Sequence, residues 1–226
     1  MGQRTFVTGD IHGCYTEMML LYKKFLRAGL IPEKDKVIFL GDYIDRGIEN
    51  KKVVTQLLKW QKKYKHWIFL KGNHEDLFED AWIKGNKKYG YGCWSANGGN
   101  QTLWEYNNEF PKSHIDFLTK RPLLYEDEKY VYVHAGLIPG RTIEECKGSV
   151  YEHELLWIRD DFINSSYNWK KKIIFGHTPN KKGLGKPIIQ DNKIGLDGAV
   201  CPPRCKNLIG LELPKEKFYI QKYIPK

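Results

Sequence analysis

Short apolar runs alternate with longer amphipathic segments over the first third of the chain. The apolar runs span residues 6–8, 37–40 and 67–70, and each leads into a polar loop that contains glycine. Short runs of β-branched and aromatic residues with such boundaries are typical of buried strands. The segments 16–28 and 50–64 carry apolar residues at helical spacing. The pattern therefore predicts strands that alternate with helices, as in an α/β fold.

The spacing of the three polar loops indicates parallel strands. Asp10 and Asp42 lie 32 residues apart, and Asp42 and Asn73 lie 31 apart. This is the length of a βαβ unit, in which a crossover helix returns the chain to the start of a neighbouring parallel strand. Parallel strands place their carboxyl ends at one edge of the sheet, where α/β proteins bind ligands. We therefore expect the three loops to meet in one crevice.

The rest of the chain shows a different pattern. Residues 84–121 are rich in Tyr, Trp, Gly and Asn and predict a helical insertion, with helices around 101–106 and 113–119. Further strands are expected at residues 130–133, 173–175, 193–196, 208–213 and 218–223. The last four lie close together in the chain, which favours mixed or antiparallel pairing in a second sheet. No linker or repeat divides the chain, so we expect residues 1–226 to form one domain.

The composition fits a globular domain with a basic surface. The chain has 226 residues, of which 41% are hydrophobic, and a formal net charge of +10. A basic surface favours anionic partners such as phosphoesters, nucleic acid or acidic proteins, but charge alone does not choose among them. No apolar run reaches the roughly 18 residues that a membrane span needs. The first residues also lack the apolar stretch of a signal peptide.

The cysteines indicate a reducing compartment. There are five, an odd number, and they are spread along the chain, so the disulfide framework of a secreted protein is not expected. We therefore expect a cytoplasmic protein. Cys201 and Cys205 flank two prolines and an arginine, with no second cysteine pair nearby. An ordinary loop is expected there rather than a zinc site or a disulfide.

Polar side chains with metal-binding chemistry follow five of the predicted strands. They are Asp10, His12, Asp42, Asn73, His134 and His177. Carboxylate, imidazole and amide groups suit Mn, Fe or Zn rather than a site of soft thiolates. Asp42, on the middle loop, is the natural bridge between two ions, which two-metal hydrolytic sites hold roughly 3.5–4 Å apart. The pattern predicts a pair of divalent cations at the sheet edge.

Three more residues fit the hydrolysis of a phosphoester at such a site. Two ions lower the pKa of a shared water toward neutrality and hold phosphoryl oxygens during in-line attack. Arg46 lies four residues after Asp42, and its planar fork of donors suits phosphate. His74 directly follows Asn73 and is placed to protonate the departing alkoxide, with Asp45 as the carboxylate that orients it.

Each feature has an ordinary structural explanation when taken alone. A Gly-Asp pair after a strand is most often a turn. A lone histidine such as His12 often only satisfies a loop, and a lone arginine such as Arg46 is most often solvated. Five such strand ends in one chain make coincidence a poor explanation, because independent coincidences multiply. We therefore favour a functional site.

These residues lie in motifs that resemble one enzyme family. The motifs are Gly9-Asp10-Ile11-His12-Gly13, Gly41-Asp42-Tyr43-Ile44-Asp45-Arg46-Gly47, Gly72-Asn73-His74-Glu75, His134-Ala135-Gly136 and Gly176-His177. They resemble the phosphoprotein phosphatase family of metallophosphoesterases, and the short length is similar to its bacterial and phage members. The resemblance covers residues 9–199. It implies a calcineurin-like metallophosphoesterase fold of the α/β class, a central β-sandwich of mixed sheets flanked by helices, with a dinuclear site at one edge.

The resemblance also implies a cofactor. It assigns Asp10, His12 and Asp42 to a first metal ion, and Asp42, Asn73, His134 and His177 to a second. Manganese is the usual activating ion of bacterial relatives, so two divalent ions, with Mn²⁺ as the expected species and Fe or Zn as alternatives, are implied here.

Roles in phosphate binding and proton transfer are implied as well. Arg46 and Asn73 would contact phosphate, and His74 would be the acid, paired with Asp45. The segment 155–159 resembles the one that supplies a second phosphate-binding arginine, so Arg159 is the candidate. The alternative for Arg159 is a surface ion pair with Asp160 or Asp161.

Three functions are compatible with these features of the sequence. The first is a metallophosphatase that hydrolyses phosphoserine and phosphothreonine in proteins, by direct attack of a metal-bridging water. The second is a dinucleoside polyphosphate hydrolase of the same fold; the symmetrical enzymes of that type carry alanine at the position of Asp45, so the intact Asp45-Arg46-Gly47 favours the first. The third is a basic nucleic-acid-binding module with a vestigial site. Phosphoproteins are the expected partners, with nucleotides second; nucleic acid and membranes are not expected.

Overall fold

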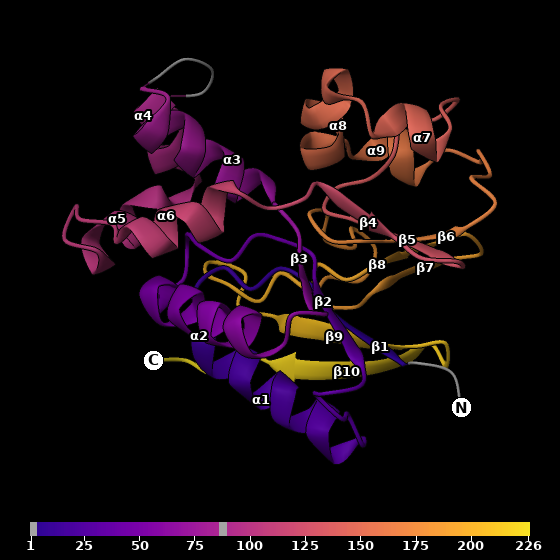
Figure 1. Ribbon diagram of the computed structural model, residues 1–226, viewed down its shortest axis with the longest axis horizontal. Helices are drawn as coiled ribbons and strands as arrows, with labels where there is room; N and C mark the ends of the chain where they lie inside the picture. Colours follow the sequence, from indigo (N-terminus) through magenta and orange to yellow (C-terminus); the bar gives the residue numbers. More distant parts are fainter. Residues whose placement is uncertain (1–3, 86–89) are drawn as a thin grey trace.

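The computed structural model describes residues 4–85 and 90–226, so residues 86–89 of the predicted insertion lie outside the described residues. Two five-stranded sheets pack face to face, and helices cover their outer faces (Figure 1). The predicted β-sandwich of mixed sheets flanked by helices is confirmed. None of the described helices is both long and apolar enough to cross a membrane.

The first sheet combines parallel and antiparallel strands. In spatial order they are β10 (Lys217–Lys222), β9 (Asn207–Leu213), β1 (Thr5–Thr8), β2 (Lys36–Phe39) and β3 (Ile68–Phe69). β1 runs parallel to β2, and β2 runs parallel to β3. The prediction of parallel neighbours is therefore confirmed, and α1 (Tyr15–Arg27) and α2 (Asn50–Lys63) are the crossover helices.

The last two strands join a different sheet from the one expected. β9 pairs antiparallel with β1, which sets Val7 opposite Leu211, and β10 pairs with β9. The prediction that all four late strands share the second sheet is wrong for these two. Without β9, the second edge of β1 would present unpaired N–H and C=O groups in the interior. Because the paired residues lie about 200 positions apart, no local pattern indicates this pairing.

The second sheet has a parallel centre and antiparallel edges. In spatial order its strands are β4 (Leu124–Glu126), β5 (Tyr130–Val133), β6 (Lys172–Phe175), β8 (Lys193–Gly195) and β7 (Ile188–Gln190). β5, β6 and β8 are parallel, and β4 and β7 pair antiparallel at the edges. The sequence pattern does not predict β4 or β7, because each is three residues long and only partly buried.

Alternate residues of the strands face two different cores. Val7 and Ile38 point between the sheets, where they pack with Tyr132 of the second sheet. Phe6 and Phe39 point the other way, into the core formed with α1 and α2. Side chains of a strand alternate with a period of two, so a strand buried on both faces needs apolar residues throughout. This explains why these strands are continuous apolar runs.

Three short helices lie on the outer side of the second sheet (Figure 1). They are α7 (Ile143–Cys146), α8 (Glu152–Trp157) and α9 (Asp160–Ile163). Leu155 of α8 and Phe162 of α9 pack on the strand residues Val133 and Phe175. Arg159 lies at the junction between α8 and α9, so this packing fixes the position of its backbone.

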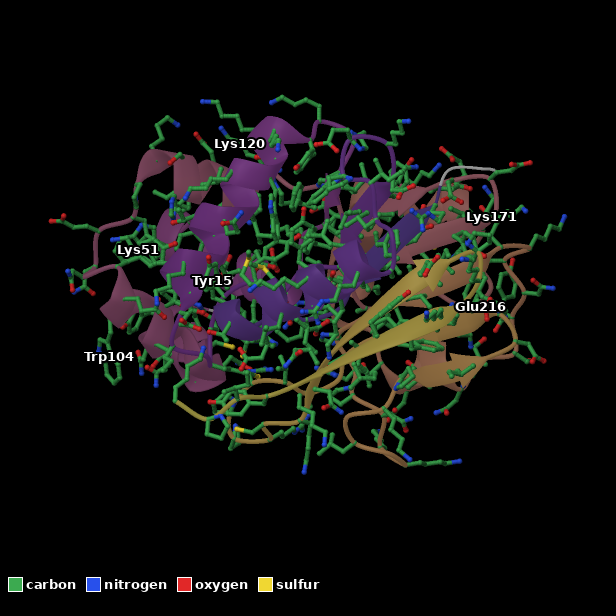
Figure 2. The ribbon with its side chains drawn as sticks, turned by 90° about the horizontal axis from the view of Figure 1, so that it is seen from below. Tyr15, Lys51, Trp104, Lys120, Lys171 and Glu216 are labelled. Atoms are coloured by element: carbon green, nitrogen blue, oxygen red, sulfur yellow. The ribbon has the colours of Figure 1, made fainter. Side chains whose placement is uncertain are left out.

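The segment of the predicted insertion lies at one side of the sandwich (Figure 1). α3 (Asn73–Phe78) leads into it, and α4 (Gly90–Trp94), α5 (Asn100–Glu105) and α6 (Lys112–Thr119) follow, with π-helical segments at Glu79–Ile83 and Ser95–Gly99. The helices expected around 101–106 and 113–119 are α5 and α6. Trp104, which is 67% exposed, projects outward from α5 (Figure 2), whereas Trp94 is fully buried.

A candidate metal centre at the sheet edge

The sequence-predicted ligands follow the carboxyl ends of strands from both sheets. Asp10 and His12 follow β1, Asp42 follows β2, Asn73 opens α3 after β3, and His134 and His177 follow β5 and β6. All six side chains are buried. Strands of both sheets therefore bring the six predicted ligands to the same edge.

Asp42 is shared by two groups of potential ligand atoms. His12, Asp42 and His74 form one group, and Asp42, His134 and His177 form the other, with the ligand atoms of each group within 4.8 Å of one another. His12 Nε2 lies 3.3 Å from Asp42 Oδ2, and His134 Nε2 lies 3.3 Å from Asp42 Oδ1. Each oxygen of one carboxylate therefore faces a different imidazole, as a bridging ligand requires.

The amide of Asn73 joins the second group. Its Oδ1 lies 2.8 Å from His134 Nε2 and 2.9 Å from His177 Nδ1. An amide oxygen and two ring nitrogens thus converge beside Asp42. Such a mixed oxygen and imidazole set suits a divalent ion of the Mn, Fe or Zn kind.

Asp10 stands slightly apart from these two groups. Its carboxylate accepts the backbone N–H of His177, at 2.9 Å and 3.1 Å from its two oxygens. A Cβ at Gly176 would lie 2.2 Å from Asp10 Oδ1, so a larger residue there would displace the Asp10 carboxylate. Burial, together with Asp197 and Asp42, raises the pKa of Asp10 well above its usual value. A buried carboxylate next to like charges is a position that a cation would stabilise.

Backbone carbonyls orient two of the histidines. His12 Nδ1 donates to Ile44 O at 2.9 Å, and His134 Nδ1 donates to Leu40 O at 2.9 Å. This fixes the tautomer and leaves the Nε2 lone pair of each ring toward Asp42. Burial, and Arg46 in the first case, lowers the pKa of His12, and burial lowers that of His134. Both rings are therefore neutral at pH 7, the form that binds metal.

Asp42 itself is held as a carboxylate. Burial alone would raise the pKa of Asp42, but the surrounding His134, His74 and His12 lower it below its usual range. The backbone also supports this position, since Asp42 Oδ1 accepts His74 N–H at 3.0 Å.

His74 and Asp45 form a hydrogen-bonded pair at the same edge. His74 Nδ1 donates to Asp45 Oδ2 at 2.7 Å, and both side chains are buried. His74 Nε2 is 4.0 Å from Asp42 Oδ2 and lines the main cavity. A histidine fixed in this way by a carboxylate can deliver a proton from Nε2.

Two residues that the sequence pattern does not indicate hold Asp45. Trp94 Nε1 donates to its carboxylate at 2.9 Å, and Thr102 Oγ1 donates at 2.6 Å while it accepts Asp45 N–H at 3.0 Å. Both lie on the helices after α3. No signal in a single sequence identifies them, because a tryptophan and a threonine on amphipathic helices are ordinary core residues.

Glu75 is a third residue whose role the sequence did not indicate. Its carboxylate accepts the N–H groups of Asp42, Tyr43 and Gly72 at 2.8–2.9 Å. It therefore braces the loop after β2 against the loop after β3. Burial and the nearby Asp42 raise the pKa of Glu75 to about 8.

The loop backbone at the site is strained. His12, Asp42, Asp45, Arg46 and His177 all have φ between 44° and 75°, a region that costs non-glycine residues of order 1–3 kcal/mol each. Such strain persists where the surrounding contacts over-determine it, and it clusters at functional sites.

Two arginines reach the cavity beside these groups. Arg46 Nη1 lies 3.0 Å from His12 Nε2, and Arg46 N–H donates to Gly98 O at 3.2 Å. Arg159 Nη1 donates to His177 O at 2.9 Å and to Thr178 Oγ1 at 3.1 Å. Asp160, one of the two alternative partners of Arg159, instead contacts Lys181 at 2.8 Å. The cavity is about 620 Å³ and is lined by both arginines, His74 and four of the six predicted ligands: His12, Asp42, Asn73 and His177.

Comparison with known sequences decides the family. Residues 3–199 match the family described as calcineurin-like phosphoesterase. The chain belongs to this family. The chain is also similar to phosphoprotein phosphatases: it is 30% identical over 145 residues to the Saccharomyces cerevisiae serine/threonine-protein phosphatase PP2A-like PPG1, a match that covers 62% of this chain and 35% of PPG1. The predicted resemblance to this group is confirmed.

One further relative and one solved structure match most of the chain. The asymmetrical bis(5′-nucleosyl)-tetraphosphatase PrpE of Anoxybacillus flavithermus is 27% identical over 217 residues, which cover 84% of this chain and 83% of PrpE. A crystal structure named for a suggested diadenosine tetraphosphatase has a TM-score of 0.70 at 18% identity and covers 99% of this chain and 95% of that chain. In contrast, the chain spans only 35–62% of the length of the yeast, Dictyostelium and Candida phosphatases that it matches.

The residues of this phosphoesterase fit divalent metal ions, which its family uses. The fit rests on the geometry described above, in which neutral imidazoles and an amide oxygen surround one shared carboxylate. The chain thus belongs to a family of phosphoesterases and has a candidate metal centre on which both sheets converge.

Proposed function

We propose that this protein is a metal-dependent phosphomonoesterase that hydrolyses phosphoserine and phosphothreonine in proteins. The observation that carries the proposal is Asp42, whose two oxygens face different histidines. The Asp45–His74 pair and Arg46 lie beside it. A bridging carboxylate, a proton donor and a phosphate-binding cation are the parts that two-metal phosphoester hydrolysis needs.

In this proposal the six predicted ligands hold two ions, with Mn²⁺ as the working species. Asp10, His12 and Asp42 hold the first, and Asp42, Asn73, His134 and His177 hold the second. The ions supply positive charge to the phosphoryl oxygens and lower the pKa of the attacking water.

The remaining residues bind the phosphate and move a proton. Arg46 and Arg159 take the equatorial phosphate oxygens with their guanidinium donors, and the Asn73 amide contacts the same group. His74 Nε2 delivers a proton to the serine or threonine oxygen as it leaves, while Asp45 accepts the hydrogen bond from Nδ1 and stabilises the charged ring. His74, Asp45 and Arg46 are therefore the proposed catalytic residues.

We further propose that residues 1–226 act as one phosphatase domain with its helical insertion at about 84–121. Both sheets supply proposed ligands, and the insertion holds Asp45 through Trp94 and Thr102. All five cysteines are free, which agrees with the proposed cytoplasmic location.

A dinucleoside polyphosphate hydrolase is the second candidate. The observation that favours it is the match to PrpE, over 84% of this chain and 83% of PrpE. The tetraphosphatase-like structure matches over 99% of this chain and 95% of its own. The chemistry at the metal centre is the same in both cases, so the distinction lies in the substrate that the cavity admits.

A substrate comparison separates the two candidates. We expect kcat/KM in Mn²⁺ to be higher for a phosphothreonine peptide than for diadenosine tetraphosphate. A strong preference for the dinucleotide would replace the first proposal by the second. Absence of all hydrolysis, together with salt-sensitive binding to nucleic acid, would support the third interpretation instead.

A further inference from the structure

Two loops line the cavity beside the proposed metal ligands. One follows β6 and includes residues 178–187. The other includes residues 198–207; it comes after β8 and Asp197, and its last residue opens β9. From the first, Lys181 and Leu184 line the cavity, and from the second, Pro203 and Arg204 do so. The cavity lining therefore includes residues that do not belong to the proposed metal centre.

The charge on these two loops has one sign. They carry the five exposed cations Lys181, Lys182, Lys186, Arg204 and Lys206, here called the basic wall, and neither loop contains Asp or Glu. The carboxylates that line the cavity are Asp42 and Asp197, both within the electrostatic reach of Asp10 at the metal centre. The two loops therefore add an excess of positive charge beside the cavity.

Backbone and side-chain hydrogen bonds tie the two loops together. Asn207 Nδ2 donates to Gly185 O at 2.7 Å, which links one loop to the other. Within the second loop, Cys205 N–H donates to Cys201 O at 3.0 Å, and Lys206 N–H donates to Ala199 O at 2.9 Å. The basic wall is thus presented by an ordered surface, which lowers the entropic cost of binding an anion there.

The two cations that line the cavity differ in their present contacts. Lys181 Nζ contacts both oxygens of Asp160 at 2.8 Å. Arg204 makes no hydrogen bond or ion pair with any residue that the structure describes. By contrast, Arg46 and Arg159 are already bound to groups of the metal centre. Arg204 is therefore the cation whose donors are available to a second group on the substrate.

We propose that the basic wall is a second anion-binding subsite, which takes a carboxylate or phosphate carried by the same substrate as the phosphate to be cleaved. The inference rests on the proposed function. For a phosphoprotein substrate it means that the enzyme selects phosphosites with acidic neighbours. Arg204 supplies the free guanidinium fork, which suits both carboxylate and phosphate, and the lysines add longer-range attraction.

The test uses two phosphothreonine peptides that differ only in their flanking residues, with Asp and Glu in one and Asn and Gln in the other. For the wild-type protein in Mn²⁺ we expect kcat/KM to be about tenfold higher for the acidic peptide. In Arg204→Glu this ratio should fall to about one, because the side chain at position 204 would then repel the acidic residues of the peptide instead of attracting them. The wild-type ratio should also fall as NaCl is raised, because salt screens exposed charges.

A matched control changes the net charge by the same amount elsewhere. Lys62 is exposed on α2, and it does not line the main cavity. Lys62→Glu should leave the acidic-to-neutral ratio as in the wild type. If Lys62→Glu lowers the ratio as much as Arg204→Glu does, net charge and not the basic wall is responsible, and the proposal is wrong. A wild-type ratio near one, or an unchanged ratio in Arg204→Glu, would equally overturn it.

A third substrate separates failure of this proposal from failure of the proposed function. If neither peptide is hydrolysed but diadenosine tetraphosphate is, the proposed function fails. The subsite then stands if Arg204→Glu lowers kcat/KM for the tetraphosphate about tenfold more than for 4-nitrophenyl phosphate, which carries one anionic group. Equal losses on these two substrates would remove the subsite as well.

Discussion

Asp42 occupies the position on which the proposed chemistry depends. Its two carboxylate oxygens lie 3.3 Å from Nε2 of His12 and 3.3 Å from Nε2 of His134, and Glu75 fixes its backbone N–H. An uncharged amide at this position would keep the shape of the side chain but would lose the negative charge between two cations.

We therefore expect Asp42→Asn to lose bound metal and activity. Loss of partners outside the ligand set already costs about 10–100-fold in affinity or activity at metal sites, so loss of the shared ligand should exceed 100-fold. Metal content of the dialysed protein and kcat/KM are the measurements. Asp191→Asn, in the exposed turn between β7 and β8, is the control. A variant at position 42 that keeps two metals and full activity contradicts the bridging role.

His74 is the residue for which geometry allows two roles. Its ring belongs to one of the two potential ligand groups, yet its Nδ1 is bonded to Asp45 at 2.7 Å, which suits a proton donor. The two roles differ in what a substitution removes.

His74→Asn should keep the metal content and lose turnover of substrates with poor leaving groups. A general acid contributes about 10²–10⁴-fold, so kcat for a phosphothreonine peptide should fall by that factor. An activated aryl phosphate needs less help and should lose much less. Equal losses on both substrates, or a loss of metal, would show that His74 is not the acid.

At the scale of elements, the helices after α3 do more than cover the sandwich. Trp94 and Thr102 donate to the Asp45 carboxylate, and Arg46 N–H donates to Gly98 O. A Cβ at Gly98 would lie 2.7 Å from Arg46 Cγ, so the chain packs tightly there. These helices thus position both members of the loop after β2 that are proposed to act in catalysis.

Trp94→Phe and Thr102→Val should therefore affect turnover through His74. Each removes one donor to a buried carboxylate, which costs about 1–3 kcal/mol. We expect kcat for the phosphopeptide to fall about tenfold in each, with a smaller loss on an aryl phosphate and with KM nearly unchanged. Trp104→Phe, on the exposed face of α5, should change neither. Equal losses on the two substrates would indicate general destabilisation rather than positioning.

The sequence pattern predicts most of the strands but not all of their pairings. Apolar runs with polar ends were sufficient to predict β1, β2, β3, β5 and β6, and with them the edge where the polar residues meet. Sheet membership of β9 was not predictable, because its pairing with β1 is non-local. The roles of Glu75, Trp94 and Thr102 were not predictable for a related reason. Each side chain bonds to the loop after β2, which is distant in the sequence.

At the scale of the whole molecule, the metal centre connects the two sheets. Asp42 and Asn73 follow strands of the first sheet, whereas His134 and His177 follow strands of the second. Bound ions would therefore link two layers that otherwise meet mainly through apolar contacts.

Removal of metal should lower the thermal stability of the protein. A free ion at 100 times its Kd stabilises the folded state by about 2.7 kcal/mol, and in a chain of this size 1 kcal/mol shifts Tm by about 2–4 °C. We expect chelation to lower Tm by about 5–10 °C and Mn²⁺ to restore it. The Asp42→Asn variant should show almost no such shift. Equal shifts in both proteins would mean that the ions bind elsewhere.

The most direct test is a crystal grown in Mn²⁺ and measured for anomalous scattering. We predict two peaks roughly 3.5–4 Å apart, with Asp42 between them, His12 and Asp10 on one ion, and Asn73, His134 and His177 on the other. A single peak, no peak, or two peaks that do not share Asp42 would contradict the proposed two-metal site.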